Sequence, residues 1–263
     1  MAARVAVVRF PGSNCERETL RALERTGLGA RIVRWNEPPA ELLRFDAYVL
    51  PGGFSYQDRI RAGAVAARLP LLEVVGRRAR QGAPVLGICN GAQILVEAGL
   101  VPGGEGDPVC LALAANRIER RDGYYTRWIF LAPGPGAERC LFTRGLDEPL
   151  PMPMAHGEGR FTSTDPELPG GLAASVALRY GRADGTPAGG FPANPNGSRA
   201  DAAGLTGGDG NVLALMPHPE RAQELAQVPE WLDGTWGGRR RAAVGRGLDG
   251  DGPGLLLFRA LAR

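Results

Sequence analysis

The chain reads Pro-Val-Leu-Gly-Ile-Cys-Asn-Gly at positions 84–91, and this stretch decides the fold. The apolar run 85–88 predicts a short buried strand, and the run 92–98 has the apolar spacing of a helix. Between them lies Gly-x-Cys-x-Gly, the sulfur version of the nucleophile elbow. A helix N-terminus favours thiolate over thiol, because its unpaired N–H groups and its dipole stabilise negative charge. Cys89 is therefore a candidate nucleophile, and the alternative is a buried structural cysteine.

Strand and helix patterns alternate along the first third of the chain. Strands are expected at 4–10, 31–35 and 47–50, and helices at about 16–26 and 62–81. This alternation predicts an α/β fold with an open, mostly parallel twisted sheet and helices on both faces. Strand-like patterns around 107–118 and 124–131 predict an added antiparallel region.

We expect one domain over residues 1–263, closed by a helix from about 254. The Gly- and Arg-rich segment at about 229–253 is expected to be a surface insertion.

The composition excludes several classes of function. The net charge of +3 comes from arginine alone, because the chain has no lysine. A Walker-type phosphate loop and a Schiff base are therefore not possible. The small, dispersed charge argues against a nucleic-acid partner, and the lack of a long apolar run argues against a membrane partner. Four scattered cysteines, with no zinc spacing and no signal-peptide pattern, predict a reduced cytoplasmic protein without a metal site.

A thiolate nucleophile needs a base, and the chain has two histidines. His218 directly follows the apolar run 212–216, which places it on the same sheet edge as Cys89. Flanking prolines hold it extended, so Glu220, two residues on, points the same way and can orient the ring. The competing base is His156. Its small neighbours predict a mobile loop, so we expect a substrate-loop or interface residue there.

Acyl transfer also needs an oxyanion hole. The backbone N–H groups of Asn90, Gly52 and Gly53 are the candidate donors, because they follow strands that end on the same edge. The alternative for positions 51–53 is an ordinary turn.

Six motifs together resemble a known family. They are Pro-Gly-Ser-Asn-Cys (11–15), Pro-Gly-Gly-Phe-Ser-Tyr-x-Asp (51–58), Gly-Ile-Cys-Asn-Gly (87–91), Ala-His-Gly-Glu-Gly (155–159), Asn-Gly-Ser (196–198) and Met-Pro-His-Pro-Glu-Arg (216–221). The chain resembles the class I, triad-type glutamine amidotransferases, and specifically the glutaminase subunits of phosphoribosylformylglycinamidine synthase. The resemblance runs from residue 5 to about residue 222 and resumes in the last helix. It implies a flavodoxin-like sheet.

The resemblance also implies a reaction. Cys89 would attack the amide of glutamine, His218 would protonate the departing ammonia and activate water, and Glu220 would orient His218. A set of further residues would bind substrate or a partner: Gln93, His156, Glu158, Asn196 and Ser198.

The same resemblance implies the partners. Ammonia would pass to a synthetase subunit, which converts formylglycinamide ribonucleotide to the amidine in purine biosynthesis. A small third subunit would bridge the two proteins. This chain would carry no cofactor, and ATP and magnesium would belong to the synthetase subunit.

Two features depart from the family pattern. Gln57 stands where the family has glycine, so a positive φ there would strain the loop. The segment at about 230–251 is extra, and its Trp231 and Trp236 would either anchor a partner or belong to a flap without a role.

Two rival interpretations stay open. One is a glutaminase of another pathway, and the other is a non-catalytic regulatory protein with a redox-sensitive Cys89.

Overall fold

The computed structural model describes residues 3–104, 106, 109–118, 123–163 and 171–262. Within this part of the chain, a nine-stranded sheet has the order β2-β1-β3-β4-β11-β10-β9-β6-β7. Its strands are β1 (Arg4–Arg9), β2 (Gly29–Arg34), β3 (Ala47–Leu50), β4 (Val85–Ile88), β6 (Tyr125–Pro133), β7 (Leu150–His156), β9 (Val176–Gly181), β10 (Ala202–Gly207) and β11 (Val212–Leu215).

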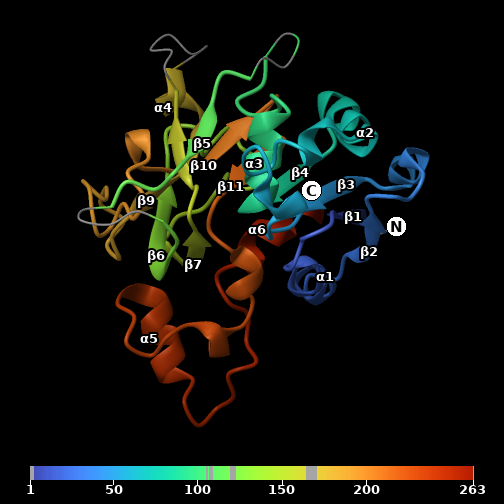
Figure 1. Cartoon of the computed structure of the whole chain (residues 1–263). Helices are drawn as coiled ribbons and strands as arrows, with labels where there is room; N and C mark the ends of the chain where they lie inside the picture. Colours follow the sequence, from blue (N-terminus) through green and yellow to red (C-terminus); the bar gives the residue numbers. More distant parts are fainter. Residues whose placement is uncertain (1–2, 105, 107–108, 119–122, 164–170, 263) are drawn as a thin grey trace.

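One half of the sheet is parallel. Strands β2, β1, β3, β4 and β11 pair in parallel, with β4 between β3 and β11. Every residue of β3, β4 and β11 is buried, because helices cover both faces of a parallel sheet. Helices α2 (Pro70–Arg80) and α3 (Asn90–Glu97) lie on one side, and α1 (Glu16–Arg25) and α6 (Leu255–Arg259) lie on the other (Figure 1). The predicted α/β fold is confirmed.

The other half of the sheet is antiparallel, as the sequence predicts. Strands β10, β9, β6 and β7 continue the sheet beyond β11. A small second sheet pairs β5 (Ala112–Ala114) with β8 (Arg160–Thr162). The start of the predicted 107–118 strand, residues 107–108, lies outside the described residues.

The predicted 62–81 helix is wrong in its first half. Residues 66–68 form a 3-10 turn, and α2 begins at Pro70. The ring of Pro70 disfavours a helical conformation at Leu69, whose φ and ψ are −80° and 147°. Proline suits the first helical position, so it starts a new helix instead of continuing the old one.

The 229–253 segment contains a helix, α5 (Gly234–Ala242), which lies apart from the sheet (Figure 1). Arg239 pairs with Glu148 at 2.7 Å, and its guanidinium stacks on the buried Trp236 at 4.4 Å from the ring centroid. Trp236 is thus an internal anchor of the insertion and not a contact for a partner. Trp231 is 72% exposed.

Candidate active site

The turn after β4 has the geometry of a nucleophile elbow. Cys89 has φ 51° and ψ −106°, a backbone conformation that residues other than glycine rarely adopt. A Cβ on Gly91 would lie 1.9 Å from the Leu50 carbonyl oxygen, and one on Gly87 would lie 2.6 Å from the Gly91 carbonyl oxygen. Both flanking positions therefore exclude any side chain. The strained turn lifts Cys89 to the N-terminus of α3.

His218 and Glu220 meet on the same edge of the sheet, just beyond β11. The Nδ1–H of His218 donates to Oε1 of Glu220 at 2.5 Å, and both side chains are buried. Burial disfavours the imidazolium, but the charge of Glu220, aided by the neighbouring cysteine sulfurs, holds the pKa of His218 well above its usual range. Because Nδ1 binds the carboxylate, Nε2 is the nitrogen left for proton transfer, and it has no hydrogen-bond partner among the described residues.

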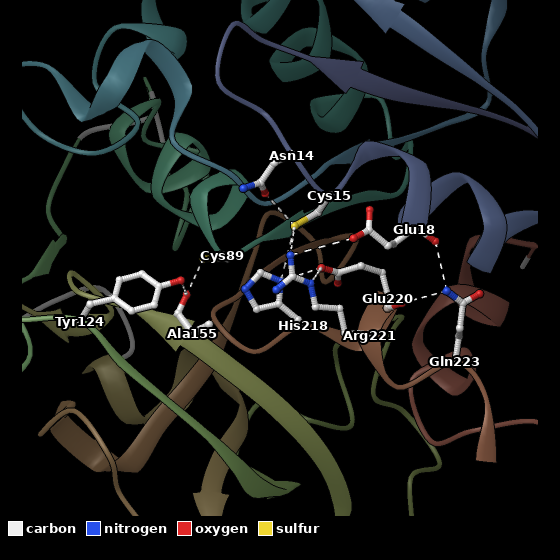
Figure 2. Close-up of polar contacts among 10 residues, drawn as sticks. All are labelled: Asn14, Cys15, Glu18, Cys89, Tyr124, Ala155, His218, Glu220, Arg221 and Gln223. Carbon is white, nitrogen blue, oxygen red and sulfur yellow. Dashed lines mark hydrogen bonds and ion pairs between the residues drawn. The ribbon is translucent and has the colours of Figure 1, made fainter. Parts of the chain in front are cut away.

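Cys89 and His218 line the same pocket, and the Cys89 sulfur is one of the groups that raise the pKa of His218. This sulfur is 3.7 Å from the Ala155 carbonyl oxygen, and a dashed line marks this contact in Figure 2. Three side chains from distant parts of the chain therefore meet at one edge: a sulfur, an imidazole and a carboxylate.

A second cysteine, Cys15, lies against the other side of His218 (Figure 2). Its thiol donates to Oδ1 of Asn14 at 3.1 Å and accepts from Arg221 at 3.2 Å, and its sulfur is 3.9 Å from Nδ1 of His218. Sequence reasoning assigned Cys15 no role, although its position after β1 could have placed it on this edge. Burial raises the pKa of the Cys15 thiol, which favours its neutral form.

Metal binding would compete with this arrangement. The donor atoms of Cys15, His218 and Glu220 lie within 4.8 Å of one another. An ion there would displace the proton that joins His218 to Glu220.

A pocket of about 250 Å³ opens beside Cys89 and His218. Among the other residues predicted for the site, those that line this pocket are Gly53, Gln93, His156 and Glu158. The remaining lining residues are Asn14, Phe54, Asp58, Tyr124, Ala155, Gly157 and Arg221. The size and the polar lining suit a small, charged metabolite.

The three predicted oxyanion donors keep backbone N–H groups that no other part of the described chain uses. Neither Gly52, Gly53 nor Asn90 donates its N–H to another described residue. Gly53 has φ 150° and lies against Ser13, an approach that a Cβ would block. Asn90 is the first residue of α3.

Gly52, like Asn90, is absent from the pocket lining. Its carbonyl accepts from the N–H groups of Asn14 and Cys15. A Cβ there would meet the His218 ring at 2.9 Å, so Gly52 makes room for the imidazole.

The first turn of α3 positions the pocket wall. Nδ2 of Asn90 donates to Oε1 of Gln93 at 2.9 Å and to Oδ1 of Asp58 at 3.3 Å. Nε2 of Gln93 donates to the Glu158 carbonyl oxygen at 2.7 Å. Two separate segments, around 58 and 158, are thereby tied to the helix that begins at the nucleophile.

The predicted mobile loop at His156 is wrong. His156 is the last residue of β7 and is buried. Its Nδ1 forms a hydrogen bond with Oδ1 of Asn116, at 3.1 Å. Oδ1 of Asn116 also accepts from the Gly159 N–H, so Nδ1 of His156 must be the donor. Burial, and then the charge of His218, lower the pKa of His156 to about 3. A residue that stays neutral in this way is a poor proton acceptor, and its ring supports the wall formed by residues 157–159.

Asn196 and Ser198 are not brought into the pocket lining. Both are buried. Asn196 donates to the carbonyl oxygen of Gly159 at 2.8 Å, and the Ser198 hydroxyl accepts from the Phe161 N–H at 3.1 Å. The prediction that they contact substrate or a partner gives way to a supporting role. They fix the backbone behind Glu158, which itself lines the pocket.

Gln57 adopts the positive φ that its position suggested. Its φ is 60°, and Tyr56 and Asp58 on either side have φ values of 54° and 52°. A left-handed conformation costs a non-glycine residue about 1 kcal/mol. We expect Gln57→Gly to raise the free energy of unfolding by up to about 1 kcal/mol in urea titrations. The matched variant Gln81→Gly, at φ −86°, should lower it by about 0.5–1 kcal/mol; equal destabilisation by both changes would contradict this account.

Asp58 carries an unfavourable charge. Burial, and then the charge of Glu158, raise its pKa from 3.8 to about 6. A raised folded-state pKa means that stability is lost as the pH rises from about 4 to about 6. We expect Asp58→Asn to raise the free energy of unfolding by about 1 kcal/mol at pH 8, allowing for solvent screening, and to change it little at pH 4. Urea unfolding at both pH values measures this, and an equal effect at both would contradict it.

The chain matches known proteins over almost its full length. The model of the CobB/CobQ-like glutamine amidotransferase domain matches residues 2–261. Phosphoribosylformylglycinamidine synthase subunit PurQ of Methanothrix thermoacetophila is 42% identical over 271 residues, covering 99% of this chain and 97% of that protein. The subunit of the same name from Thermus thermophilus is 43% identical and covers 83% and 89%.

Among solved structures, that of PurLQS from Thermotoga maritima matches with a TM-score of 0.66. It is 34% identical and covers 94% of this chain and 99% of that one. The chain therefore belongs to the family of glutamine amidotransferases that includes these PurQ subunits.

Proposed function

We propose that this chain is the glutaminase subunit of a phosphoribosylformylglycinamidine synthase, which hydrolyses glutamine and delivers ammonia for purine biosynthesis. The observation that supports it best is the convergence of Cys89, His218 and Glu220 beside the pocket, in a chain 42% identical to a PurQ subunit.

The proposed reaction starts at Cys89. Its thiolate attacks the side-chain carbonyl carbon of glutamine, and the N–H groups of Gly53 and Asn90 stabilise the oxyanion. His218, protonated and oriented by Glu220, gives its proton to the departing ammonia. The neutral ring then takes a proton from water, which attacks the γ-glutamyl thioester and releases glutamate.

The proposed partner is a synthetase subunit, bridged to this chain by a small third subunit. The name of the matched Thermotoga maritima structure, PurLQS, supports an assembly of several subunits. We assign ATP and magnesium to the synthetase subunit, because this chain has no lysine for a phosphate loop. We place the reaction in the cytoplasm. Among the helices that the structure describes, none has the length and apolarity to span a bilayer.

The experiment is to measure ammonia and glutamate release from glutamine by the complex of this chain with its synthetase subunit. We expect release, coupled to formation of the amidine when ATP and formylglycinamide ribonucleotide are present. Release of ammonia without amidine would favour a glutaminase of another pathway. No release from the assembled complex would contradict the proposal.

A further inference from the structure

Cys15 has no part in the proposed reaction, but it lies against the two side chains that control proton transfer. Cys15 is 1% exposed, His218 3% and Glu220 0%. A sulfur, an imidazole nitrogen and a carboxylate oxygen from these residues lie within 4.8 Å of one another (Figure 2). These are the three kinds of side-chain atom that bind Zn²⁺ in proteins. The ligands come from positions 15, 218 and 220, so the cysteine spacing in the sequence could not predict them.

The distances in this cluster need only a small adjustment to hold a metal ion. Tetrahedral Zn²⁺ with ordinary bond lengths separates its sulfur and nitrogen ligands by about 3.6 Å, and its nitrogen and oxygen ligands by about 3.4 Å. Sγ of Cys15 is 3.9 Å from Nδ1 of His218, and Oε1 of Glu220 is 2.5 Å from that nitrogen. The carboxylate must therefore move by about 1 Å, because the ion is larger than the proton between the two atoms. Oδ1 of Asn14, 3.1 Å from the sulfur, is close enough to be the fourth ligand.

The charges of the cluster suit a divalent ion. Binding of Zn²⁺ displaces one proton from the Cys15 thiol and one from Nδ1 of His218, and both protons pass to solvent. The thiolate and the carboxylate of Glu220 then carry two negative charges, which cancel the charge of the buried ion. Arg221 donates to the sulfur at 3.2 Å, and Glu18, 4.0 Å from Arg221, offsets the guanidinium charge. A hydrogen bond of this kind orients a ligand for its metal.

We propose that Cys15, His218 and Glu220 form an inhibitory binding site for Zn²⁺. The ion enters from the catalytic pocket, which His218, Asn14 and Arg221 line. With the metal on Nδ1, the ring keeps a proton on Nε2, so His218 can no longer take a proton from the nucleophile or from water. Glu220 also stops orienting the ring. The metal site stands on this geometry, and the inhibition rests on the proposed function.

The first experiment titrates the full chain with Zn²⁺ under reducing conditions and follows binding by calorimetry. We expect one ion per chain, with a Kd of about 1 µM or lower. Cys15→Ala should raise the Kd by at least about 100-fold, since even the outer-shell partners of metal ligands are worth about 10–100-fold. The matched control Cys140→Ala, at another buried cysteine outside the pocket, should change the Kd by less than about threefold.

The second experiment measures inhibition in the complex with the synthetase subunit. Free Zn²⁺ at about ten times the Kd should lower glutamine-dependent amidine formation by about tenfold, because about one site in eleven stays empty. Synthesis from ammonium chloride should change by less than about twofold, and a chelator should restore the glutamine-dependent rate. In the Cys15→Ala complex, the same Zn²⁺ concentration should lower the glutamine-dependent rate by less than about twofold.

Cobalt distinguishes this site from one on the nucleophile. In Cys89→Ala, bound Co²⁺ should still give the near-ultraviolet charge-transfer band of a thiolate ligand, because Cys15 supplies the thiolate. This measurement also decides the matter if Cys15→Ala does not fold.

Several results would overturn the inference. They are a wild-type chain that binds no Zn²⁺, full zinc affinity in folded Cys15→Ala, and loss of the cobalt band in Cys89→Ala, which would assign the thiolate to Cys89. Equal inhibition with both nitrogen sources would also overturn it, because the metal would then act outside the glutaminase. A zinc-free complex that hydrolyses no glutamine would instead contradict the proposed function, and the zinc and cobalt titrations would still decide whether the metal site exists.

Discussion

Cys89→Ala should lower glutamine-dependent amidine formation by at least about 10³-fold, because Cys89 is the cysteine that lines the pocket and forms the thioester. Synthesis from added ammonium chloride should stay within about twofold of the wild-type rate, since the synthetase subunit then needs no glutaminase. Steady-state rates of the assembled complex with each nitrogen source measure both effects. Loss of both activities would mean that the change damages assembly and not only the nucleophile.

Cys15→Ala is the matched control. Cys15 and Cys89 are both buried, and the Cys15 sulfur is 3.9 Å from Nδ1 of His218. Cys15 therefore lies on the side of the ring where the Nδ1–H donates to Glu220. Its burial favours the neutral thiol. We expect Cys15→Ala to lower the glutamine-dependent rate by less than about tenfold. A larger loss than in Cys89→Ala would transfer the nucleophile role to Cys15.

Glu220→Gln should lower kcat for glutamine by about 10²–10⁴-fold, because the amide no longer stabilises the imidazolium or fixes its orientation. It should also move the pH profile. Burial lowers the pKa of His218, and the carboxylate of Glu220 is the largest influence that raises it. Without that charge the pKa falls, so His218 loses its proton at lower pH. The high-pH decline of kcat should therefore begin at lower pH in the variant.

The pH dependence of kcat between about 5 and 10 measures this shift in the complex. Gln223→Glu is not a suitable control, because Gln223 donates to the Glu220 carbonyl oxygen. Arg25→Gln is suitable, since its ion pairs with Glu224 and Asp251 lie away from the pocket. An unshifted profile in Glu220→Gln would show that the carboxylate does not control the protonation of His218.

The features that sequence could predict are those that depend on local chemistry. The elbow at Cys89 needs small residues on both sides, and the contacts of Gly87 and Gly91 explain why. The edge shared by Cys89 and His218 follows from the order of parallel strands, since β4 and β11 are neighbours. Such features need only the rule that parallel strands end together.

The features that sequence could not predict depend on packing between distant segments. Pro70 divides the predicted 62–81 helix. The sequence alone does not show that the part before Pro70 contains a 3-10 turn and no α-helix. Two small neighbours made His156 look mobile, but a partner 40 residues away, Asn116, fixes its ring. Asn196 was in a matched motif, but a motif does not show whether a residue touches substrate or supports a residue that does.

The central claim is that Cys89 forms the bond with glutamine. The most direct test treats the chain, alone and with its synthetase subunit, with 6-diazo-5-oxo-L-norleucine and maps the modified residue by peptide mass spectrometry. The account predicts one adduct, on Cys89, formed faster in the complex and blocked by excess glutamine. An adduct on Cys15, or none on Cys89 in the complex, would contradict it.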